Sequence, residues 1–127
     1  LPKSAVVKKV IDGDTVELFN GTVLRYVGVT APEEGEDFAE EATKLNTELV
    51  EGKEIKLEYD NYKSDKFGRI LAYPIINGVN VCVELVRKGM AELIIYQKRK
   101  PFIHQVQLLE SQEQAKQKKL GIWSKGN

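Results

Sequence analysis

The chain has 127 residues, of which 42% are hydrophobic and 30% charged, and its formal net charge is zero. This length and composition are typical of one globular domain, so we expect residues 1–127 to form a single domain with a sizeable core. No stretch approaches the roughly 18 consecutive apolar residues of a membrane span, so we expect no membrane partner, and the single Cys82 excludes an internal disulfide.

Charge is unevenly distributed along the chain. Residues 1–62 hold 7 Lys and Arg against 14 Asp and Glu, whereas residues 63–127 hold 12 against 5. An acidic half suits a cation and a basic half suits phosphates, unless folding interleaves the two halves into a neutral surface. The chain opens with LPKSAVV and no methionine, so it looks trimmed; a secreted or cell-envelope location is an expectation, and whether an export signal was removed stays open.

The first half predicts three strands and a helix. Residues 5–11 and 15–19 are rich in β-branched side chains, and the Asn-Gly pair before residues 22–29 is a strong hairpin signal. A helix follows and ends near Gly52, because apolar residues recur at helical spacing, namely Phe38, Ala42, Leu45 and Leu49.

The second half predicts two strands and two helices. Residues 53–59 and 68–76 read as strands, and a short helix runs from an N-cap at Asn80 to a stop at Gly89. A short extended segment covers residues 91–96, and a helix runs from Pro101 to about Lys119, after which Trp123 packs back onto the body. Five strands and three helices in this order predict an α+β fold, compatible with a five-stranded Greek-key barrel of the OB type.

Several polar residues could together perform phosphodiester hydrolysis. Asp12 and Asp14 flank a glycine, and this pattern is typical of an ordinary turn or of a cation site. Arg25 lies inside a strand, where it either faces solvent or is directed at a site. Glu33 ends the third strand and Arg69 begins the last one. Carboxylates can hold a hard cation and accept the proton of water, while two guanidinium groups can stabilise a pentacoordinate phosphate.

Five segments in order resemble the staphylococcal nuclease (thermonuclease) family: VIDGDTVEL, LRYVGVTAPEE, SDKFGRILAY, LVRKGMAEL and SQEQAKQKKLGIWS. The resemblance spans essentially the whole chain. It implies an OB-fold barrel with three helices and a Ca²⁺-dependent endonuclease that acts on DNA and RNA and leaves 3′-phosphate ends. It also implies that Glu33 is the general base and that Arg25 and Arg69 bind the phosphate and stabilise its transition state.

The resemblance also implies a metal site with one departure. Asp14 matches the metal-binding aspartate, Asp12 the aspartate just behind it, and Ala31 a residue that contributes its backbone carbonyl. Thr30 stands where the family has a second carboxylate ligand. One of the acids that follow either reaches the metal instead, or all of them belong to a solvated helix start, namely Glu34, Glu36, Asp37, Glu40 and Glu41.

Other positions concern nucleic-acid binding. Lys66 matches a lysine near the bound nucleotide, Phe67 replaces the usual tyrosine, and Tyr96 stands in for a base-stacking tyrosine, whereas His104 reads as a surface residue. Single-stranded or breathing DNA and RNA are the expected partners of a monomer. The alternative is a non-catalytic OB-fold module that binds nucleic acid or protein; the presence of Arg25, Glu33 and Arg69 favours the enzyme.

Overall fold

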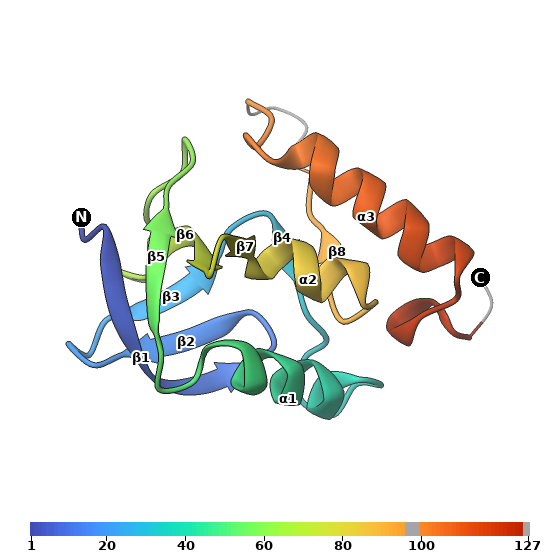
Figure 1. Ribbon diagram of the computed structural model, residues 1–127, viewed down its shortest axis with the longest axis horizontal. Coiled ribbons are helices and arrows are strands. Elements are labelled where there is room, and N and C mark those ends of the chain that lie inside the picture. The colour runs from blue at the N-terminus through green and yellow to red at the C-terminus, as the bar shows by residue number, and fades with distance from the viewer. Residues whose placement is uncertain (96–99, 126–127) are drawn as a thin grey trace.

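The computed structural model describes residues 1–95 and 100–125 and has an α+β architecture (Figure 1). Five strands form the barrel: β1 (Ser4–Asp12), β2 (Thr15–Leu18), β3 (Val23–Tyr26), β5 (Glu54–Glu58) and β6 (Ile70–Ile76). Strand β1 pairs antiparallel with β2 and β5, β2 with β3, and β5 with β6. The parallel pairing of β3 with β6 closes the barrel and sets Arg25 opposite Leu71. The predicted five-stranded OB-type barrel is confirmed.

Three helices accompany the barrel: α1 (Ala39–Val50), α2 (Val81–Arg87) and α3 (Gln105–Gln117). The predicted N-cap of α2 is confirmed, since the side chain of Asn80 accepts a hydrogen bond from the Cys82 amide at 2.9 Å. The prediction that α3 begins at Pro101 is wrong. The first helical residue is Gln105, and the segment before it is held by another part of the chain, since the amide of Ile103 donates to the carboxylate of Asp60 at 2.8 Å.

The predicted third strand is interrupted. Gly28 has a φ of +80°, which turns the chain and separates β3 from the two-residue strand β4 (Val29–Thr30). Strand β4 pairs antiparallel with β8 (Glu92–Leu93), so that Thr30 lies opposite Glu92. A short β7 (Val79–Asn80) pairs with β6, and a 3₁₀ turn, η1 (Gly121–Trp123), follows α3.

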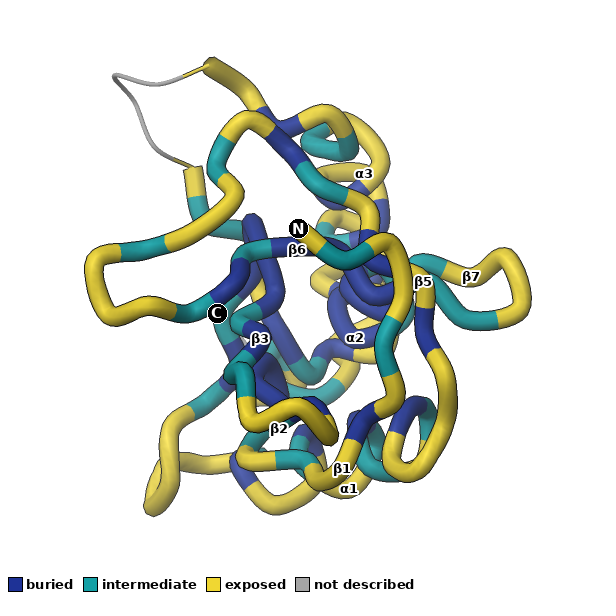
Figure 2. Tube along the Cα trace, turned by 90° about the vertical axis from the view of Figure 1, so that its left-hand side faces the viewer, coloured by how far each residue is buried: buried dark blue, intermediate teal, exposed yellow. Residues whose placement is uncertain are grey.

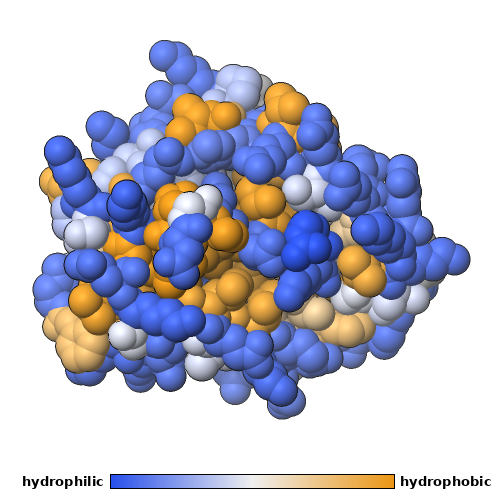
Figure 3. All heavy atoms as spheres, viewed as in Figure 1, coloured by the Kyte–Doolittle hydropathy of each residue, from blue (hydrophilic) through white to orange (hydrophobic). Residues whose placement is uncertain are grey.

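The core lies between the barrel strands and α2, whose buried segments face one another in Figure 2. Fully buried side chains come from β1, β2, β3, β5 and α2, for example Val7, Val16, Leu24, Ile55 and Leu85. Cys82 is also a buried core residue. Hydrophobic side chains on the face of Figure 3 gather between β5, α1 and α2, with hydrophilic groups around them. Within the described residues, no helix is both long enough and apolar enough to cross a membrane.

Candidate active site

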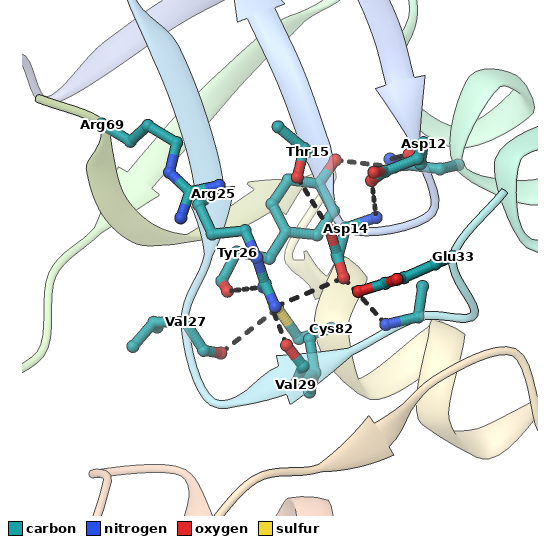
Figure 4. Close-up of polar contacts among 12 residues, drawn as sticks. Asp12, Asp14, Thr15, Arg25, Tyr26, Val27, Val29, Glu33, Arg69 and Cys82 are labelled. Atoms are coloured by element: carbon teal, nitrogen blue, oxygen red, sulfur yellow. Dashed lines mark hydrogen bonds and ion pairs between the residues drawn. The ribbon is translucent and has the colours of Figure 1, made fainter. Parts of the chain in front are cut away.

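Asp14 lies in the tight turn between β1 and β2, and its carboxylate is buried at the centre of a polar cluster (Figure 4). One oxygen, Oδ1, accepts a hydrogen bond from the hydroxyl of Thr15 at 2.7 Å. The other, Oδ2, accepts from the Ala31 amide at 2.8 Å and lies 3.3 Å from Nη2 of Arg25. Asp14 therefore joins the β1–β2 turn to β3 and to the residue that follows β4.

Asp12 supports this turn from behind. Its Oδ1 accepts a hydrogen bond from the Asp14 amide at 3.0 Å, and its backbone carbonyl accepts from Nδ2 of Asn46 on α1 at 2.9 Å. Asn46 in turn accepts from the hydroxyl of Tyr26 at 2.6 Å. Burial raises the pKa of the Asp12 carboxyl, and the side chain of Asp14, through a hydrogen bond and its negative charge, raises it further, whereas the donating amide of Asp14 acts in the opposite direction. The structure thus places Asp12 next to Asp14.

Position 13 requires a glycine because there is no room for a side chain, and not because of its backbone angles. Its φ lies outside the left-handed region, but a Cβ atom here would come within 2.6 Å of the Ala31 Cβ and 2.8 Å of the Ala42 Cβ. Such contacts are far inside van der Waals distance, so a side chain would push α1 and the β4 end away from the turn. The glycine of the Asp-Gly-Asp sequence therefore allows Asp14 to reach the amide of Ala31.

Arg25 points into the site rather than to bulk solvent. Its Nη1 donates to the carbonyls of Tyr26 at 2.6 Å and Val29 at 2.8 Å, while Nη2 faces Asp14. These bonds fix the plane of the guanidinium, since its donors form a rigid fork. Both N–H groups of Nη1 are used by these bonds, whereas the Nε group has no hydrogen bond with the described part of the chain and can donate to a ligand. The side chain of Arg25 is 17% exposed, so it does not face bulk solvent.

Arg69 stands just before β6 and is held by a carboxylate of the preceding turn. Its Nε donates to Asp65 Oδ2 at 2.6 Å, and the amides of Arg69 and Phe67 both donate to Asp65 Oδ1. Partial burial acts to raise the pKa of Asp65, but these hydrogen bonds outweigh it and bring the pKa below its ordinary value. Asp65 therefore stays ionised and orients Arg69.

A pocket of about 660 Å³ lies on the side of Asp14 that holds the two arginines. Its lining includes Arg25, Arg69, Lys66 and Phe67. The ring of Phe67 is 71% exposed, and its centroid lies 5.3 Å from the Lys66 ammonium and 5.5 Å from the Arg69 guanidinium carbon. Cations and an exposed ring next to one another suit a phosphate with an attached base. Tyr96, the other predicted stacking residue, lies outside the described residues.

A second hollow, of about 540 Å³, lies on the other side of Asp14 and is acidic. It is lined by Thr30, Ala31, Pro32, Glu33, Glu36, Asp37, Glu92 and Ile122. Glu33 is exposed and points toward Asp14 in Figure 4, and its carboxylate has no hydrogen bond or ion pair with the described part of the chain. Its neighbours are engaged, since Glu36 accepts from the Glu33 amide at 2.6 Å and Asp37 pairs with Lys125 at 2.7 Å.

The structure therefore brings together Asp12, Asp14, Arg25, Ala31 and Glu33, and it places Arg69 in the same pocket as Arg25. The sequence pattern did not identify Asn46, Tyr26 or Asp65 as parts of the site. Asp65 had a local signal, because it stands four residues before Arg69 in a turn that contains glycine. Tyr26 and Asn46 had none, since their hydrogen bond spans 20 residues of sequence.

Comparison with known proteins places this geometry in context. A family model described as staphylococcal nuclease homologue matches residues 23–125. The chain is 37% identical to the endonuclease YncB and 34% identical to the SPbeta prophage-derived endonuclease YokF, both of Bacillus subtilis (strain 168), over 92% of its length. It spans 60% and 43% of the length of these two relatives. It is also 28% identical to the thermonuclease of Staphylococcus intermedius, over 97% of this chain and 77% of that protein.

Proposed function

The chain belongs to the staphylococcal nuclease family, and we propose that it is a Ca²⁺-dependent endonuclease that hydrolyses phosphodiester bonds of DNA and RNA. The observation that carries the proposal is the position of Glu33. An exposed carboxylate, without a hydrogen bond or ion pair among residues 1–95 and 100–125, points toward a buried Asp14–Arg25 pair, and a pocket with a second arginine opens beside that pair. A base, a cation-binding carboxylate and phosphate-binding guanidinium groups are the parts that this hydrolysis needs.

The donor set of this site fits a hard divalent cation. Asp14 offers carboxylate oxygens with Asp12 behind it, Ala31 offers a backbone carbonyl and Thr30 a hydroxyl, and Ca²⁺ takes oxygen ligands of these kinds. Among residues 1–95 and 100–125, no three acidic, histidine or cysteine side chains are grouped closely enough to hold a metal by themselves. The protein would therefore supply part of the coordination sphere, with Asp14 as the anchor. A bound cation would neutralise phosphate charge and favour attack on phosphorus.

The chain's own residues perform the remaining steps. Glu33 accepts a proton from water as the water oxygen forms a bond to phosphorus and the bond to the 5′-oxygen breaks. The free N–H groups of Arg25 and the outer nitrogens of Arg69 donate to the phosphate oxygens, whose negative charge grows in the transition state. The leaving 5′-oxygen takes up a proton from solvent water and Glu33 returns its proton to solvent, so the products carry a 3′-phosphate and a 5′-hydroxyl.

One incubation tests the proposal. The protein is mixed with single-stranded DNA in 10 mM Ca²⁺ or in excess chelator, and the product ends are identified by mass spectrometry. We expect cleavage with Ca²⁺, none with chelator, and 3′-phosphate ends. Undiminished cleavage in chelator refutes the metal dependence. Binding of DNA without any cleavage, across divalent cations, supports the alternative of a non-catalytic module.

A further inference from the structure

The carboxylate of Asp60 is buried and joins three separate segments of the chain. It stands two residues after β5 and is 4% exposed. Its Oδ2 accepts a hydrogen bond from the hydroxyl of Tyr73 on β6 at 2.7 Å and from the amide of Ile103 at 2.8 Å. Its Oδ1 accepts from the amide of Asn61 at 2.7 Å. Hydrogen bonds to a charged acceptor are strong, so Asp60 holds the segments that supply these three donors in fixed positions.

Tyr73 remains a donor in this arrangement. Burial raises the pKa of its hydroxyl far above the ordinary value, and the hydrogen bond to Asp60 and the negative charge of that carboxylate raise it further. The ring of His104 packs edge-on against Tyr73, with centroids 4.8 Å apart, and its Nε2 contacts the carboxylate of Glu58. Residues 103 and 104 are therefore attached to β5 and β6 by two neighbouring contacts.

This attachment determines where Phe102 lies. Phe102 is 5% exposed and meets Tyr62 edge-on, with centroids 5.7 Å apart. Its ring also packs on Gly28, where an added Cβ would come within 3.3 Å of it. The Gly28 turn carries the Val29 carbonyl that holds Arg25, and Phe102 itself lines the pocket that contains both arginines. A shift of the 102–103 backbone would therefore move one wall of the pocket and loosen the turn that orients Arg25.

We propose that Asp60 is a positioning residue for substrate binding. It anchors Ile103 and thereby holds Phe102 against the Gly28 turn, where Phe102 forms a wall of the pocket that contains both arginines. The inference rests on the proposed function, since it assigns the pocket to nucleic acid. Without the anchor, the pocket is formed in only part of the molecules, and the apparent dissociation constant rises by the inverse of that fraction.

Two tyrosines give a matched test. Tyr73→Phe removes the hydroxyl that donates to Asp60, whereas Tyr59→Phe removes a hydroxyl that donates to the Pro2 carbonyl at 2.6 Å, away from the pocket lining. Asp60→Asn is the third variant, which keeps the shape of the side chain but loses its charge. Each is assayed for binding of a labelled single-stranded octanucleotide in chelator, by fluorescence anisotropy, and for KM and kcat in Ca²⁺.

We expect Tyr73→Phe and Asp60→Asn to weaken binding and raise KM about three- to tenfold, the effect of one lost hydrogen bond, with kcat nearly unchanged. Tyr59→Phe is expected to match the parent protein. Circular dichroism checks folding, and Tyr73→Phe decides the outcome if Asp60→Asn does not fold. Equal binding in all variants, or equal weakening in Tyr59→Phe, refutes the positioning role. A parent protein that binds no oligonucleotide refutes the proposed function and this inference with it.

Discussion

Replacing Thr30 by aspartate should strengthen cation binding. Thr30 ends β4 and lines the acidic hollow together with Glu33. A hydroxyl is a weaker Ca²⁺ ligand than a carboxylate, and with few charged ligands we expect a dissociation constant of about 1 mM or above, the weak end of the range of protein sites. An added carboxylate at the same strand end should tighten binding about tenfold, equivalent to about 1.4 kcal/mol.

In the absence of metal, Thr30→Asp should lower the free energy of unfolding. Thr30 lies opposite Glu92 in the β4–β8 pairing, so Thr30→Asp places two like charges on neighbouring strands. Such a pair is destabilising by roughly 0.5 kcal/mol. In 10 mM Ca²⁺, dissociation constants of about 1 and 0.1 mM correspond to stabilisation of about 1.4 and 2.7 kcal/mol. Thr30→Asp should therefore be less stable than the parent in chelator and more stable in Ca²⁺.

Calorimetric titration with Ca²⁺ and urea denaturation with and without Ca²⁺ measure both effects. Thr22→Asp, which adds the same charge at the distant β2–β3 turn, serves as the control and should leave Ca²⁺ binding unchanged. Unchanged or weaker binding in Thr30→Asp would refute the reasoning. It would show that an acid among residues 34–37 already completes the site, which is the alternative that the sequence left open.

Three further outcomes follow from the site. Glu33→Gln should lower turnover at least ~10²-fold in single-turnover assays, without changing the midpoint of urea denaturation. The control Glu48→Gln, on the exposed face of α1, should keep the turnover of the parent protein. Near-parental turnover in Glu33→Gln would exclude Glu33 as the general base. Because the pKa of Asp65 is lowered on folding, its contribution to stability is present above about pH 4 and is lost as pH falls below that value. Asp65→Asn should thus lower the free energy of unfolding by about 0.5–1 kcal/mol at pH 7 and by less at pH 3, and an equal loss at both pH values contradicts this. Raising salt from 50 to 200 mM should weaken octanucleotide binding about twentyfold if about three phosphates are contacted, and salt-independent binding excludes the pocket that contains Arg25 and Arg69 as the binding surface.

The fold class and the family could be predicted from the sequence because their signals are local. Periodic apolar residues, Asn-Gly turns and an N-cap asparagine at residue 80 mark the elements, and the short segments that resemble the family keep their order along the chain. The closure of the barrel could not be derived in this way, since the parallel pairing of Leu24 with Ile70 depends on contacts between distant residues. The roles of the site residues, the monomeric state and the location in the cell stay predictions.

The errors near Gly28 and Pro101 have a common physical origin. Residues 22–29 carry the composition of a single strand, and Pro101 suits a first helical turn, so local preference supports both predictions. Tertiary contacts override them in the structure. The ring of Phe102 packs against the Gly28 turn, and Asp60 takes the amide of Ile103 before the helix begins. Both deviations thus occur in segments that form a wall of the pocket containing Arg25 and Arg69.

The charge asymmetry of the sequence persists in space on the two sides of Asp14. The acidic hollow takes three of its four carboxylates from the first half of the chain, and the pocket takes Lys63, Lys66 and Arg69 from the second half. The ion pair between Asp37 and Lys125 joins the halves, and each side of the site takes one charged residue against this trend, Arg25 in the pocket and Glu92 in the hollow. Potentials of opposite sign extend over about a Debye length, ~8–10 Å, so a polyanion is drawn to one side of Asp14 and a cation to the other. The Asp14–Arg25 pair marks the boundary where a cation and a phosphate would meet, and Glu33 points toward that boundary from the acidic side.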